Sequence, residues 1–120
     1  MRTIEIDIKG KGKATAMLDD RNPRIAEAIW QALPFEAKAN LWGEEVYFDF
    51  PLKMENENPS PIATAGDICY WSPGHAFCVF FGKTQPYSEV NHIGKVAERL
   101  ELFKKVAAGD RIVLKKKQES

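Results

Sequence analysis

The segment Gly66–Thr84, with the sequence GDICYWSPGHAFCVFFGKT, constrains the fold more than any other part of the chain. Its pattern predicts two strands, Asp67–Ser72 and Ala76–Phe81, joined by a turn at Pro73–His75. Because aromatic and β-branched side chains suit a pleated, packed surface, strands that are apolar on both faces need cover on both sides. Such a pair fits the wall of a small closed barrel, with one face inside and the other under a helix or a pocket.

The rest of the chain supplies further strands and two helices. Alternating or apolar patterns predict strands at 2–9, 13–18, 35–42, 45–50, 90–97 and 111–115, and amphipathic patterns predict helices near 23–33 and 99–108. Eight antiparallel strands can close on themselves and so remove their edges. We therefore predict a mainly β protein, a closed eight-stranded antiparallel barrel capped by two α-helices. Its buried residues should include Ile4, Ile6, Ile8, Ala14, Ala16, Val46, Phe48 and Phe80.

Three local signals refine this prediction. Asn22 is a good N-cap for the first helix, and Pro23 suits the first helical position. The segment Lys53–Ile62 is polar and rich in proline, which indicates a flexible loop. Gly94 lies inside a predicted strand, where glycine often marks a bulge or a close backbone approach.

Length and composition favour one small domain. The 120 residues suggest a barrel domain over residues 1–116 and a frayed tail at 117–120. The formal net charge of zero argues against nucleic acid as a partner, and no stretch is apolar enough to span a bilayer. We expect no nucleic-acid or membrane partner and a cytoplasmic location. In a reducing cytosol, Cys69 and Cys78 are expected to be small buried thiols, although a disulfide between the two strands is open on geometry.

Motifs for catalysis, metals or cofactors are missing from the sequence. His75 and His92 are far apart and have no second ligand at metal-binding spacing, and no phosphate loop or nucleophile elbow is present. We therefore expect no metal, no cofactor and no catalytic residue. Glu44 and Glu45 form an acidic pair at a turn, and we interpret them as solvated turn residues.

Polar-tipped aromatic residues are the best candidates for a binding site, since such side chains serve pockets and interfaces alike. The hypothesis is a groove that binds a small ligand or an extended peptide. Its candidate ligand-binding residues are Asn40, Trp42, Tyr47, Trp71, His75 and Phe77. A homo-oligomer in which the aromatic patch is an interface remains an alternative.

Two long motifs carry a family resemblance. The stretch Asn40–Phe48, NLWGEEVYF, and the stretch Gly66–Thr84 resemble the signature segments of a small prokaryotic family of cyclophilin-like proteins of unknown function. The resemblance implies the cyclophilin barrel, with eight antiparallel strands and a helix at each end, which agrees with the element order predicted above.

The similarity to true cyclophilins, which are peptidyl-prolyl isomerases, is more limited. Ile93–Val96 is similar to their F-G-K-V stretch, and their pocket histidine would fall near Val90 or Asn91. Their F-H-R stretch corresponds to Phe35–Ala37, so that the arginine is absent; the next residue, Lys38, has a charge but no planar double donor. If the chain is an enzyme, the resemblance implies a divergent peptidyl-prolyl isomerase, but the missing arginine favours a binding module.

Overall fold

The computed structural model describes residues 2–117, and these form nine strands, one α-helix and two 3-10 segments. Each segment predicted as a strand contains at least one. The elements are β1 Thr3–Ile8, β2 Gly12–Leu18, α1 Pro23–Gln31, β3 Phe35–Lys38, β4 Asn40–Trp42, β5 Glu45–Asp49, β6 Asp67–Trp71, η1 Ser72–Gly74, β7 Ala76–Phe80, β8 Asn91–Glu98, η2 Leu100–Lys105 and β9 Arg111–Lys117.

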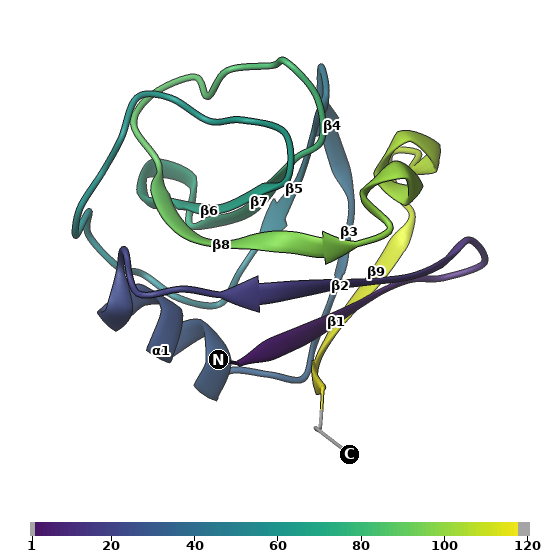
Figure 1. The fold of residues 1–120 in the computed structure, drawn as a ribbon, viewed down its shortest axis with the longest axis horizontal. Helices are drawn as coiled ribbons and strands as arrows, with labels where there is room; N and C mark the ends of the chain where they lie inside the picture. Colours follow the sequence, from purple (N-terminus) through teal and green to yellow (C-terminus); the bar gives the residue numbers. More distant parts are fainter. Residues whose placement is uncertain (1, 118–120) are drawn as a thin grey trace.

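All strand pairs are antiparallel and belong to one sheet, in the order β3-β9-β1-β2-β8-β6-β7-β5-β4 (Figure 1). The two end strands, β3 and β4, are separated by the single residue Ala39. One stretch of chain therefore joins both ends of the sheet, and the result is a nearly closed antiparallel barrel.

The prediction of eight strands is wrong at this junction. Residues 35–42 form two strands because the chain changes partner at Ala39: β3 pairs with β9, whereas β4 pairs with β5. Ala39 is buried, and its N–H and C=O bond to the backbone of Asp110 and Gly109 instead of continuing a ladder. An alternating pattern does not reveal such a change of partner, because both halves keep the period of a strand.

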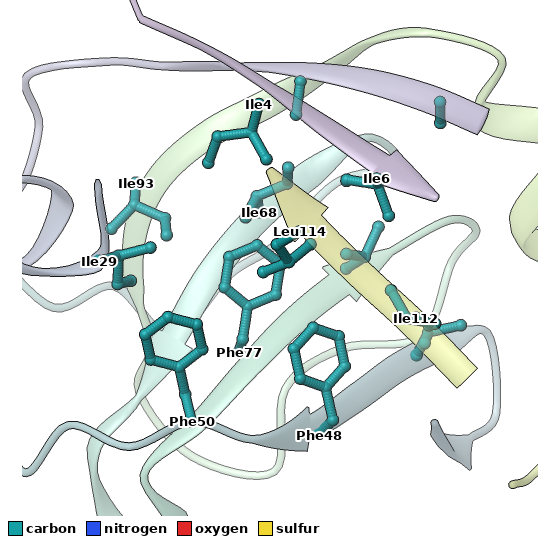
Figure 2. Packing of buried hydrophobic residues seen from close by; sticks show 14 of the residues in the cluster. Ile4, Ile6, Ile29, Phe48, Phe50, Ile68, Phe77, Ile93, Ile112 and Leu114 are labelled. Atoms are coloured by element: carbon teal, nitrogen blue, oxygen red, sulfur yellow. The ribbon is translucent and has the colours of Figure 1, made fainter. Parts of the chain in front are cut away.

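The barrel interior is a continuous apolar core. All eight residues predicted to be buried are at most 1% exposed, which confirms that part of the prediction. Phe77 lies at the centre of this core, and its ring stacks on Phe48 with 5.2 Å between centroids (Figure 2). Residues from β1, β6 and β9 surround these rings, including Ile4, Ile68 and Leu114.

The two predicted helices differ from each other in outcome. Helix α1 is present, ends two residues early at Gln31, and buries Ile25, Ala26 and Ile29. The second is the short 3-10 helix η2, so the prediction of two α-helices is wrong. The segment η2 has only six residues and buries Leu102 and Phe103. For so short a helical segment, i→i+3 hydrogen bonds are common. The two helical segments lie on opposite sides of the barrel (Figure 1).

The start of α1 is stabilised by a distant residue. Asn22 makes no side-chain cap; its amide instead bonds to the backbone of His92 and Asn58. The Glu57 carboxylate accepts hydrogen bonds from the N–H groups of Arg24 and Ile25, where a negative charge also favours the helix dipole. The prediction that Asn22 caps the helix is therefore wrong, and Glu57 of the 53–62 loop caps it instead.

The prediction for Gly94 is confirmed. The pairing of β6 with β8 shifts register between Ile68 and Cys69, and a Cβ on Gly94 would collide with the backbone carbonyl of Met17. The chain therefore needs glycine at this point, because β2 and β8 approach too closely for a side chain.

Strand β9 runs to Lys117, further than predicted, and Lys117 pairs with Thr3. The predicted tail at 117–120 thus loses its first residue to the strand, and its other residues lie outside those described. Within residues 2–117, no helix has the length and hydropathy that crossing a membrane requires.

Candidate functional site

The outer face of the β6–β7 hairpin differs from the inner one. Strand alternation places Ile68, Tyr70, Phe77 and Val79 in the barrel core, whereas Cys69, Ala76, Cys78 and Phe80 belong to a second buried cluster. Both cysteines are free and buried, as expected from the sequence. Of these four outer-face residues only Cys78 lines the pocket described next, and its small side chain leaves room above the sheet.

A pocket of about 300 Å³ occupies part of this outer face. Three aromatic residues from separate strands line it: Trp42 at the end of β4, Tyr47 on β5 and Trp71 at the end of β6. The remaining lining comes from Glu45, Cys78, Pro86, Tyr87 and Val90. The volume lies at the lower end of the range for small-molecule sites.

The aromatic rings meet at steep angles. Tyr87 contacts Trp42 with 6.2 Å between centroids and 68° between planes, and it contacts Trp71 at 6.3 Å and 87°. The indole N–H of Trp71 donates to the Ser88 hydroxyl at 2.7 Å. With its polar edge already bonded, Trp71 offers apolar ring surface to the pocket rather than a hydrogen bond.

Hydrogen bonds hold the 82–90 loop, which forms one wall, onto the barrel. The Glu44 carboxylate accepts from the Lys83 N–H at 2.8 Å, and the Glu44 N–H donates to the Thr84 hydroxyl at 2.6 Å. Gln85 exchanges two bonds with the backbone of Ala63. The loop is thus anchored at several points, which favours a preformed pocket.

Glu45 is the only charged side chain among the pocket-lining residues that the structure describes. It is 6% exposed, because it starts β5 on the face opposite Val46 and so lies under the loop. Burial raises the pKa of its carboxyl group, and a hydrogen bond with Cys78 partly opposes that rise. The interpretation of Glu45 as a solvated turn residue is therefore wrong.

The six candidate residues from the sequence do not all meet. The structure brings together Trp42, Tyr47 and Trp71 at the pocket. Phe77 lies inside the barrel (Figure 2), and Asn40 is exposed on β4 outside the pocket lining. His75 has left-handed backbone geometry after η1, with its Nδ1 3.4 Å from the Tyr70 hydroxyl, away from the lining residues.

Sequence reasoning missed Tyr87 and gave Glu45 another role. Tyr87 had a usable signal, because it is an aromatic residue in a polar loop. Glu45 had a weaker one, since strand alternation puts it on the same face as Tyr47. Neither signal shows that the 82–90 loop brings Tyr87 to the same pocket as Glu45, because that contact is long-range.

A buried cluster of Asp67, Cys69 and His92 lies on the same outer face. The His92 Nε2 lies 2.8 Å from the Ile62 carbonyl, and its Nδ1 faces both the Cys69 sulfur at 3.5 Å and the Asp67 carboxylate at 3.4 Å. A nucleophile–base–acid relay needs the thiol and carboxylate on different ring nitrogens. Burial also raises the pKa of the Cys69 thiol. We therefore assign the cluster a structural role, because the contact between His92 and the Ile62 carbonyl positions the 60–65 loop.

The model of the cyclophilin-like family matches residues 2–115. The chain belongs to the cyclophilin-like family. This match covers nearly the whole chain and agrees with the resemblance carried by Asn40–Phe48 and Gly66–Thr84. No curated protein matches the chain.

Two solved structures share this fold. The solution structure of the hypothetical protein AF2241 from Archaeoglobus fulgidus is 32% identical, with a TM-score of 0.81 over 97% of this chain and 95% of that one. The structure of McbB in complex with tryptophan is 20% identical, with a TM-score of 0.83 over 98% of this chain but 45% of that one. The second likeness establishes the fold alone.

Proposed function

We propose that this protein is a binding module that holds a small organic ligand, or one side chain of an extended peptide, in the aromatic pocket. The observation that carries the proposal is the convergence of Trp42, Tyr47, Trp71 and Tyr87 around a hollow of about 300 Å³. Aromatic walls with few polar groups are typical of ligand sites.

Exposure of apolar surface supports this proposal. Trp42 is 43% exposed and Tyr87 is 80% exposed, although both contact other aromatic rings. Large aromatic residues are costly to leave in water, and their clustering marks a surface that gains free energy when covered. A ligand in the pocket, packed against the rings, would supply that cover.

The solved relatives suggest the first probes. McbB, which shares the fold, has been solved with tryptophan bound. A flat aromatic ligand also suits a pocket with steeply inclined ring walls. We therefore choose tryptophan and indole, the latter as a neutral fragment without the amino-acid group.

The test uses the three tryptophan indole N–H signals in a proton–nitrogen NMR spectrum. Trp42 and Trp71 line the pocket, whereas Trp30 lies on α1 beneath Arg2 and Lys116. Titration with indole or tryptophan should shift the signals of Trp42 and Trp71 and leave Trp30 unchanged. Each probe is added to about 1 mM, which detects binding with a Kd of that order. An unchanged spectrum with both probes would count against the proposal.

A matched pair of variants locates the binding. Trp71→Ala should abolish the response to the probe, while Trp30→Ala, a tryptophan outside the pocket, should preserve it. Size-exclusion chromatography of the unmodified protein tests the alternative that a second copy covers Trp42 and Tyr87. A dimer that Trp42→Ala dissociates would assign the patch to an interface.

A cytoplasmic location also stays a proposal. It is supported by two free, buried cysteines on neighbouring strands, since free thiols are typical of a reducing compartment.

A further inference from the structure

Glu45 differs from the other buried acidic residues. Asp7 and Asp67 are buried too, but Lys9 lies 2.9 Å from the first and Lys95 lies 3.6 Å from the second. Among residues 2–117, Glu45 is the only buried acid without a cationic side chain within 4.0 Å. Buried charges are normally paired, because an unpaired charge loses its hydration without compensation.

The walls around Glu45 suit a positive charge. The faces of aromatic rings carry negative electrostatic potential, and several ring faces around one space attract alkylammonium groups. The rings of Trp42, Trp71 and Tyr87 line this pocket, and Tyr87 meets the two indole rings at 68° and 87°. Trp71 contributes its ring rather than its N–H, which is bonded to Ser88.

We propose that the ligand of this pocket is an organic cation whose alkylated ammonium group lies in the pocket against the aromatic rings that line it and pairs with Glu45. This inference rests on the proposed function and names the class of ligand. The cation supplies the partner that Glu45 lacks, and the rings bind its alkyl groups.

Other ligand charges fit less well. An anionic ligand would meet the Glu45 carboxylate with no lysine, arginine or histidine among the described lining residues. A neutral ligand would leave the carboxylate buried without a counter-charge. Charge complementarity therefore separates a cation from a neutral molecule of the same shape.

Choline and 3,3-dimethylbutan-1-ol provide the test, since they differ in one atom and one charge. Isothermal titration calorimetry on the unmodified protein should show choline binding at least about tenfold more tightly. Glu45→Gln should remove most of this difference. Asp49→Asn changes an exposed acid on the same strand that does not line the pocket, so it should preserve the difference.

A second variant tests the rings independently of Glu45. Trp42→Leu keeps apolar area at an exposed site but removes an aromatic face, and it should weaken choline more than the alcohol. A thermal melt of each variant verifies that it is folded.

The pH dependence gives a readout that a structural role for Glu45 would not produce. Choline does not titrate, so its affinity should rise as Glu45 ionises and should be flat with pH in Glu45→Gln. The other titratable groups lining the pocket are the phenols of Tyr47 and Tyr87 and the thiol of Cys78. Burial raises the pKa of the Cys78 thiol. The rise should therefore follow Glu45 alone below neutral pH.

The outcomes separate the two proposals. Equal binding of choline and the alcohol, both lost in Trp71→Ala, would overturn the cation inference and leave the binding module standing. A preference for choline that survives Glu45→Gln would overturn the pairing with Glu45. Failure of choline, the alcohol, indole and tryptophan alike would overturn the binding module itself.

Discussion

The two faces of the β6–β7 hairpin are both buried, yet they are built from different side chains. Inward-facing Tyr70 and Phe77 are paired across the strands and fill the barrel, whereas outward-facing Cys69 and Cys78 are paired across the same strands and are small. At this position side-chain volume fills the inner face, whereas the small Cys78 leaves room for a ligand on the outer one. The covering 82–90 loop adds one aromatic residue, Tyr87, to the outer face instead of closing it.

The largest expected effect lies on the inner face. Phe77→Ala should lower the free energy of unfolding by about 3–5 kcal/mol, because it leaves a cavity beside Phe48 that the barrel cannot fill. Cys78→Ala, the next residue on the outer face, should cost about 1 kcal/mol. Urea denaturation measures both. Similar losses for the two variants would remove the distinction between a packed face and a face with room.

The second effect concerns Trp71, at the rim of the outer face. Trp71 is only partly buried, so Trp71→Ala should cost about 1–2 kcal/mol and abolish the response to the probe ligands. If Trp71 were purely part of the wall, its loss should cost roughly 3–5 kcal/mol without any ligand effect. His75→Ala provides a comparison, since His75 lies outside the pocket lining. A thermal melt and a ligand titration on both variants distinguish these cases.

The division between the faces also shows how far the sequence could be interpreted. Strand positions followed from alternation and turn residues, and the dense hairpin correctly indicated a wall covered on both sides. The faces themselves could not be assigned, because both are apolar and one residue of register exchanges them. For that reason Phe77 was grouped with Trp71, although the structure pairs Phe77 with Tyr70 and Trp71 with Ala76.

Long-range contacts account for the other errors. The change of partner at Ala39, the cap that Glu57 gives to α1, and the cover that the 82–90 loop gives to Glu45 each join segments distant in sequence. Local propensity describes a residue's own element and carries no information on these partners. The acidic pair illustrates this. Both residues were interpreted as solvated turn residues, but Glu44 anchors the 82–90 loop and Glu45 is a buried carboxylate.

A smaller effect should appear in the pH dependence of stability without ligand. Because burial raises the pKa of Glu45 above the unfolded value, the folded state binds more protons, and stability falls as pH rises from the unfolded pKa of ~4.3 to the folded one. Glu45→Gln should lack this loss and be more stable than the unmodified protein at neutral pH. Thermal melts from pH 4 to pH 7 provide the measurement, with Asp49→Asn as the control.

A variant that is less stable at every pH would show that the Glu45 carboxylate stabilises the fold through contacts of its own. The stability of the outer face would then depend on that carboxylate, as the stability of the inner face depends on its aromatic rings. The two faces would differ less than we infer.

The smallest expected effect is on prolyl isomerisation, where we expect none. The rotation barrier of the imide bond is ~18–20 kcal/mol, and a positioned donor is the usual way to lower it. The described residues lining the pocket include no arginine, and Lys38 is exposed on β3, opposite Arg111 and outside that lining. A protease-coupled assay on a proline-containing peptide should therefore give the uncatalysed rate for both the unmodified protein and Lys38→Ala, with an active cyclophilin as the positive control. Turnover that Lys38→Ala abolishes would make isomerisation the leading function and would move the chemistry from the aromatic pocket to the surface of β3.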